Sequence, residues 1–377
     1  MTSLFKRLTS LLEWLFEAAL PIWAALLALT VGAIVLFLLG VNPFRAYLAM
    51  VQGAFGSFNA FAETLVKATP LLLIGIGICI AYRGNVINIG GEGQMIVGAI
   101  LATWFGLTFT NWPGWLVIPI ALLLGMLGGA LWGGIPGVLK AYFNVNEILS
   151  TVMMNGIAVQ LMNFLLRGPM IDPAQALQAS KIPQTAPLIE AFRLPRWVPT
   201  RLHLGVLIAI LLAIAVYLLL WRTTIGYRIR AVGLNPFAAR YAGIPVERYT
   251  VLALVLSGMF AGLAGAVQVY GVNYRMITDG SAAGFTGGSG FNGIVAALFG
   301  QLHPIWTMPA SILFGALLVG ANRMQRVTQI PSALVVALNG LVVVFVVSSE
   351  IFRRWQQQRK LKMQSGHLRS EQEQATL

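Results

Sequence analysis

Charged residues are scarce in this chain of 377 residues. Only 10% of the residues are Asp, Glu, Lys or Arg, whereas 58% are hydrophobic. A soluble domain carries about 25% charged residues, so this composition excludes a soluble fold of this size. The hydrophobic residues also occur in blocks of about 20, the length that crosses a bilayer as an α-helix. The composition therefore predicts an integral membrane protein.

Cysteine and histidine are also rare. The single cysteine, Cys79, excludes an internal disulfide, and in its hydrophobic run it acts as a small apolar side chain. His203, His303 and His367 are scattered and form no metal-binding or acid–base pattern. None of the six lysines is followed by Ser or Thr, so the chain lacks the Walker A phosphate-binding motif. We therefore expect no catalytic residue, no metal and no cofactor, and we predict that the chain is not an enzyme.

The net charge of +13 would suggest nucleic-acid binding in a soluble protein. Here the Lys and Arg residues lie between hydrophobic blocks and at the two ends of the chain, where they act as topology signals. With ten spans, the basic N-terminus, the basic loop after the sixth span and the basic tail fall on one side. The positive-inside rule makes that side cytoplasmic. We therefore expect both termini in the cytoplasm and no nucleic-acid partner.

We predict an all-α polytopic membrane protein with about ten transmembrane helices, one of them broken or re-entrant. Residues 1–19 are then a cytoplasmic segment, residues 20–352 the transmembrane domain, and residues 353–377 a cytoplasmic tail. Residues 167–203 form an external loop, and residues 222–249 form a cytoplasmic loop. The short eighth segment and the Gly-rich stretch before it are the broken element. The ten segments are Leu20–Gly40, Phe61–Tyr82, Val86–Phe109, Trp115–Leu139, Ile148–Leu166, Leu204–Trp221, Thr250–Tyr270, Phe291–Gln301, Ile305–Gly320 and Pro331–Phe352.

Glycine recurs at every fourth position of the fourth segment, at Gly125, Gly129, Gly133 and Gly137. A related pair occurs in the seventh segment. Small residues at this spacing share one face of a helix and let a neighbouring backbone approach closely. The pattern predicts a tightly packed bundle, and it carries no information about a ligand.

Amide and hydroxyl side chains gather in two Gly-rich stretches, residues 84–94 and 280–293. Such side chains either line a hydrated path or hydrogen-bond helices to one another, and both interpretations remain open. The candidates for lining a path are Asn85, Asn88, Glu92, Gln94, Asn155, Ser289 and Asn292.

The predicted cytoplasmic loop contains the signals of a helix of about two turns. Asn235 is a good N-cap, Pro236 suits the first helical position, and Gly243 lies where a helix ends. So short a helix is unstable alone in water, so it must dock on something. The small side chains of Ala238 and Ala239 make one side of the helix narrow, which suits insertion into a groove of a partner. The alternative is that the helix docks on its own bundle. The candidate anchors are Phe237, Arg240 and Tyr241.

Four stretches together resemble the permeases of ribose-type and nucleoside-type ABC importers, and the resemblance extends from about Glu63 to the last span. It implies a helical permease of the bacterial inner membrane that pairs with itself or a paralogue. It also implies a separate ATPase in the cytoplasm, which fits the missing Walker A motif, and a solute-binding protein outside. The stretches are Asn88–Gln94, Asn146–Thr151 with Asn155, Gly233–Ile244 and Gly290–Gly300.

The resemblance also assigns the short cytoplasmic helix as a coupling helix that contacts the ATPase. The matching positions are Asn235, Pro236, Ala238, Ala239 and Gly243, and we add Phe237 and Arg240 to the predicted coupling surface. The resemblance favours a nucleoside as the solute, with ribose or another simple sugar as the alternative. The competing class is an ion-coupled secondary transporter, which places charged residues in the middle of the membrane. Few such residues are present here.

Overall fold

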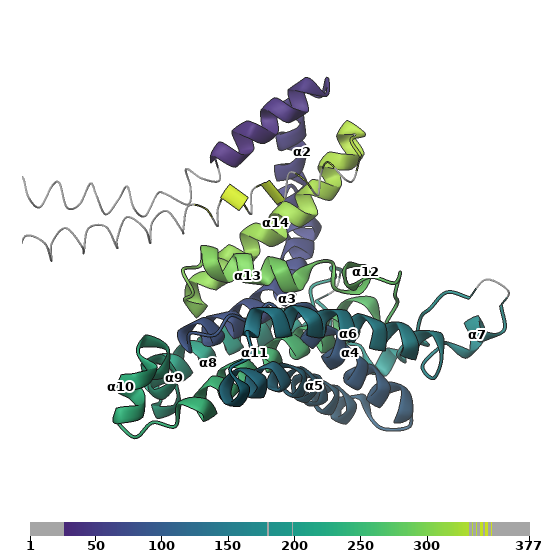
Figure 1. Ribbon diagram of the computed structural model, residues 1–377. Helices are drawn as coiled ribbons and strands as arrows, with labels where there is room; N and C mark the ends of the chain where they lie inside the picture. Colours follow the sequence, from purple (N-terminus) through teal and green to yellow (C-terminus); the bar gives the residue numbers. More distant parts are fainter. Residues whose placement is uncertain are drawn as a thin grey trace, which may run out of the picture. The chain divides into compact units, whose positions relative to one another are not determined.

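The computed structural model describes residues 26–178, 181–197 and 199–331, together with positions 334, 337, 340, 341, 344, 345 and 348. The predicted N-terminal segment 1–19 and tail 353–377 lie outside the described residues. The chain divides into two units, one of Met1–Met50 with Ala321–Leu377 and one of Val51–Gly320. The described residues are mostly helical and contain two isolated β-bridges but no strand (Figure 1).

The unit Val51–Gly320 contains most of the described helices. A helix over Leu26–Leu38 belongs to the other unit, and α2 and α14 include the residues at which the units are divided. The elements are α2 (Pro43–Phe55), α3 (Phe58–Arg83), α4 (Gly91–Thr108), α5 (Gly114–Phe143), α6 (Glu147–Arg167), α7 (Pro173–Ala176), the 3-10 turn η1 (Glu190–Phe192), α8 (Gly205–Arg222), α9 (Thr224–Leu234), α10 (Pro236–Tyr241), α11 (Val246–Gln268), the π-helical turn η2 (Val269–Asn273), α12 (Ala282–Thr286), α13 (Ser289–Phe299) and α14 (Pro304–Thr328).

Six of the described helices are long and apolar enough to cross a membrane, which confirms a polytopic helical membrane protein. These six are α3, α5, α6, α8, α11 continued through η2, and α14. The predicted third segment is helical only from Gly91, because the chain turns between α3 and α4, where Asn85 has a φ of 56°. The predicted eighth segment is α13, of 11 residues, and the left-handed glycines Gly287 and Gly288 separate it from α12.

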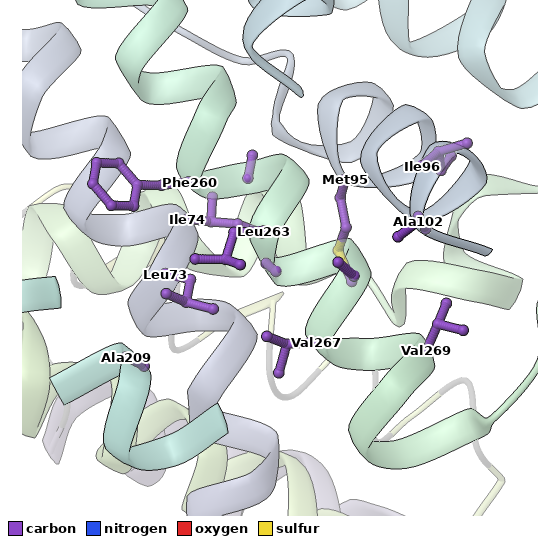
Figure 2. Packing of buried hydrophobic residues seen from close by; sticks show 14 of the residues in the cluster. Leu73, Ile74, Met95, Ile96, Ala102, Ala209, Phe260, Leu263, Val267 and Val269 are labelled. Atoms are coloured by element: carbon purple, nitrogen blue, oxygen red, sulfur yellow. The ribbon is translucent and has the colours of Figure 1, made fainter. Parts of the chain in front are cut away.

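Helix α3 is the centre of the unit Val51–Gly320. In its most apolar stretch of 18 residues, about 89% of the residues are buried. The corresponding share is 28% in each of α5, α6 and α8, which leave apolar sides exposed. Leu73 and Ile74 of α3 lie in one cluster with Met95 of α4 and Leu263 of α11 (Figure 2). Because lipid tails are as apolar as these side chains, dense packing rather than exclusion of water holds such helices together.

The predicted glycine ladder is a contact between backbones. A Cβ atom on Gly129 of α5 would lie 2.7 Å from Gly262 Cα of α11, and one on Gly133 would lie 2.7 Å from Leu254 O. Real Cβ atoms do not approach so closely. Helices α5 and α11 therefore depend on glycine at these positions for their packing distance, as the sequence pattern predicts.

The described residues of the predicted external loop pack on the segment that follows α11. The backbone N–H groups of Leu188 and Leu194 donate to the carbonyls of Tyr274 and Tyr270, at 2.7 and 2.9 Å. Thr185 N donates to Met276 O at 2.9 Å. These bonds satisfy backbone groups that a loop of this length would otherwise leave unpaired.

Candidate functional site

The buried polar network begins at Asn88, in the turn before α4. Its Nδ2 group donates to Gln94 Oε1 at 2.9 Å and to Ser257 Oγ of α11 at 2.8 Å. Its Oδ1 atom accepts from Gly90 N at 2.9 Å and from Gln94 Nε2 at 3.1 Å. All three side chains are buried. The Asn88 amide therefore joins the α3–α4 turn to both α4 and α11.

Asn155 of α6 joins the same end of α4. Its Oδ1 atom accepts from Gly93 N at 2.8 Å, and its Nδ2 group donates to Ile89 O at 3.0 Å. The first backbone N–H groups of a helix have no partner within the helix. The Asn155 side chain of α6 supplies a hydrogen-bond acceptor for one of these N–H groups, so α6 is bound to the start of α4.

Glu92 connects α4 to α13. Its Oε1 atom accepts from the backbone N–H groups of Gly290 and Phe291, at 2.8 and 3.3 Å. These groups belong to the first turn of α13, where the helix dipole favours a negative charge. The second oxygen, Oε2, is buried and has no hydrogen-bond partner among the described residues. A Cβ atom on Gly290 would lie 2.7 Å from Glu92 Cγ, so the contact requires glycine.

The remaining pathway candidates lie around this network rather than within it. Ser289 is buried and donates to Thr286 O at 2.6 Å, whereas Asn292 is partly exposed and Asn85 is exposed in the α3–α4 turn. Four of the seven predicted side chains, Asn88, Glu92, Gln94 and Asn155, thus meet where α4, α6, α11 and α13 converge. Sequence reasoning missed Ser257, whose only signal is a lone hydroxyl in an apolar run.

The second candidate site is α10. Asn235 Oδ1 accepts from Phe237 N at 3.0 Å and from Ala238 N at 3.1 Å, which is the predicted N-cap. Pro236 occupies the first turn, and Gly243 takes a left-handed φ of 78° after the helix ends. The local prediction of this helix is confirmed.

The side chains of α10 divide into two sets. Ala239 is buried against the chain itself, whereas Ala238 is exposed. Phe237 and Tyr241 of α10 are 83% and 97% exposed, and Leu234 at the end of α9 is 88% exposed. One side of α10 therefore packs on its own bundle, and the other presents uncovered anchors.

Residues 60–347 match the family model described as the permease component of the branched-chain amino acid transport system. The chain belongs to this permease family. The match covers more than half of the chain, and it confirms the resemblance drawn from the four sequence stretches. Because this is a transport family, the permease is not an enzyme.

Several relatives of the permease are similar over most of their length. The guanosine ABC transporter permease protein NupP of Bacillus subtilis is 35% identical over 92% of this chain and 96% of its own. The nucleoside ABC transporter permease protein NupB of Lactococcus lactis is 32% identical over 88% and 90%. The glucose ABC transporter permease protein TsgB13 of Haloferax volcanii is 32% identical over 89% and 88%. No solved structure matches the chain.

The permease has a polar cleft of about 450 Å³ beside α10. Two ion pairs border it, Lys140 with Glu147 at 3.0 Å, and Arg240 with Glu247. Arg240 of the predicted coupling surface is thus paired within its own chain. The cleft places the α3–α4 turn, the α5–α6 turn and α10 at one end of the unit, and Asn85 lines it with them.

Proposed function

We propose that this permease imports a neutral, polar solute, and that the solute is a nucleoside. In this proposal a separate ATPase, a solute-binding protein and a second permease subunit, identical or paralogous, complete the ABC importer. The support comes from two relatives whose names specify guanosine and nucleosides. A relative named for glucose makes a simple sugar the second candidate.

The charges of the polar network agree with a neutral solute. An anionic solute would require Lys or Arg along its path, and a cationic one would require several carboxylates. The network instead offers the amides of Asn88, Gln94 and Asn155, and its carboxylate, Glu92, is engaged by the start of α13. Amides and hydroxyls can replace the water around a sugar hydroxyl without trapping the solute.

We propose that the pathway opens at this convergence of helices. The hydrogen bonds of Asn88, Asn155 and Glu92 close α4 against α11, α6 and α13, so movement of α6 or α13 would release these groups to face a solute. Asn85, Gln94, Ser289 and Asn292 complete the proposed path. Substitution of Asn155 by Ala should change the KM for the solute, and an unchanged KM would argue for a purely structural role.

We propose that α10 is the coupling helix and that the ATPase covers its exposed anchors. Phe237 and Tyr241 carry the proposal, because large side chains exposed together on one short helix indicate a surface that a partner covers. Since Ala239 is buried, a bulky residue there would disturb the permease itself. Substitutions at Phe237 therefore test the contact more cleanly.

We propose ten transmembrane segments and cytoplasmic termini, with the permease in the bacterial inner membrane. The cleft beside α10 supports one cytoplasmic end for the α3–α4 and α5–α6 turns, in agreement with the basic loop of residues 222–249. A C-terminal alkaline phosphatase fusion should be inactive and a green fluorescent protein fusion should fluoresce. The opposite pair of results would contradict this topology.

The ligand of the partner solute-binding protein tests the substrate most simply. The binding protein should be purified without refolding, and its bound small molecule identified by mass spectrometry. A nucleoside is the expected result. A pentose or hexose would favour the second candidate, and a branched-chain amino acid would exclude both.

A further inference from the structure

Rings and positive charges gather at the ends of α3 and α8. The ring centroid of Trp221 lies 5.3 Å from that of Tyr217 and 4.9 Å from that of His303. The guanidinium carbons of Arg83 and Arg230 lie 5.2 and 5.8 Å from the Trp221 centroid. We call these five residues the Trp221 cluster. Neither the polar network nor the exposed side of α10 includes any of them.

The cluster lies at the edge of the apolar part of the unit. Arg83 is the last residue of α3, and Trp221 is the last but one of α8, and both helices are candidate spans. Arg230 comes from α9, which leads into α10 (Figure 1). Trp and Tyr concentrate where membrane helices leave the hydrocarbon region. The cluster therefore lies at headgroup level, at the end of the unit that carries α10.

The cluster is positively charged. Arg230 forms no ion pair within the described ranges, and its buried Nε group has no hydrogen-bond partner there. Burial, with the positive charge of Arg83, lowers the pKa of His303, so its imidazole is neutral at pH 7. The positive charge of the cluster that the described residues leave without an ion-pair partner is that of Arg230, and guanidinium groups bind phosphate oxygens well.

We propose that the Trp221 cluster binds the phosphate of an anionic phospholipid. Basic pockets at the cytoplasmic ends of membrane helices recognise such headgroups. The neighbouring surface suits acyl chains, because Leu211 and Leu218 of α8 are exposed. Trp306, in the first turn of α14, is 64% exposed and adds an aromatic ring of the kind found at this depth. This apolar surrounding favours a lipid over an acidic segment of a protein.

Lipid binding to the purified full-length chain tests the proposal. Native mass spectrometry would measure the dissociation constants of phosphatidylglycerol and phosphatidylcholine in detergent. The matched control for Arg230→Gln is Arg228→Gln, which removes the same charge from the same helix. Arg228 is exposed and donates instead to Tyr249 Oη at 2.8 Å. Arg230→Lys retains the charge and serves as the rescue variant.

We expect the wild type to prefer phosphatidylglycerol, and Arg230→Gln to weaken that preference about fivefold, the effect of one basic residue at a membrane surface. Arg228→Gln should leave the preference unchanged, and Arg230→Lys should restore most of it. Equal losses in Arg228→Gln and Arg230→Gln, or no loss in either, would overturn the proposal.

Two further measurements distinguish a lipid from other ligands. Excess inorganic phosphate should not displace the lipid, and displacement would assign the cluster to free phosphate. If Arg230→Gln bound phosphatidylglycerol normally but lost the ATPase subunit, the cluster would belong to a protein interface and the proposal would fail. If Arg230→Gln does not fold, the dissociation constants of the wild type still test the proposal, since equal affinities for phosphatidylglycerol and phosphatidylcholine contradict it.

Discussion

The packing of α5 against α11 can be tested by adding a single methyl group. In Gly129→Ala the new Cβ would lie 2.7 Å from Gly262 Cα and closer still to Gly258 O. Both neighbours are backbone atoms, so the two helices must move apart. Overpacking of this kind costs about 1–3 kcal/mol, but alanine also gains about 1 kcal/mol of helix propensity over glycine.

Gly156→Ala is the matched control, because it separates these two effects. Gly156 lies in α6, and a Cβ atom there would have no atom within 4 Å. Both substitutions gain the same propensity, so the difference between them isolates the clash. We therefore expect Gly129→Ala to be less stable than Gly156→Ala by about 1–3 kcal/mol.

Reversible unfolding in mixed micelles with increasing SDS would measure this difference. Uptake activity of Gly156→Ala should remain, which shows that the control still folds. If the two variants had equal free energies of unfolding, α5 and α11 would not be in backbone contact at Gly129. The structural interpretation of the glycine ladder would then be wrong.

Three other predictions concern the polar network, α10 and the predicted external loop. Asn88→Ala leaves buried hydrogen-bonding partners unpaired and should lower the free energy of unfolding by about 1–3 kcal/mol. Asn292→Ala removes a partly exposed amide and should have little effect. Equal losses of stability in the two variants would contradict this prediction. Phe237→Ala should reduce ATP-dependent uptake about tenfold without loss of stability, as expected for an interface anchor; a similar defect in the exposed Tyr227→Ala would show that the effect is not specific. Burial, with the positive charge of Arg196, lowers the pKa of His203 to about 4. Between about pH 6.5 and 4 the unfolded chain therefore binds more protons than the folded chain. The free energy of unfolding should thus decrease as the pH is lowered from about 6.5 to 4. His203→Gln should flatten the pH dependence of the unfolding free energy, and an unchanged slope would refute this origin.

Local sequence signals predicted α10 well. Asn235, Pro236 and Gly243 each encode their position through their own side chain or backbone preference, and the structure shows the helix between them. The glycine ladder was predictable for a similar reason, since one helix face holds the whole pattern. The same signals could not show that Ala239 is buried and Ala238 exposed, because that depends on how α10 lies on α9 and α11.

Long-range partners could not be predicted from the sequence. Glu92 meets the start of α13 about 200 positions later in the chain, and Asn88 meets Ser257 of α11. Nothing in the local pattern of either residue indicates its partner. The sequence alone therefore does not choose between the two interpretations of the polar stretches, and the contacts show how these side chains join helices in this conformation.

Solute uptake tests the central claim most directly. The full-length permease should be reconstituted in vesicles with its ATPase and second permease subunit, and supplied with the binding protein and labelled solutes. We expect ATP-dependent accumulation of guanosine, adenosine or uridine that unlabelled nucleosides compete away, and no accumulation of a branched-chain amino acid. Accumulation of ribose or glucose without any nucleoside would contradict the nucleoside assignment, and accumulation without ATP would contradict an ABC importer.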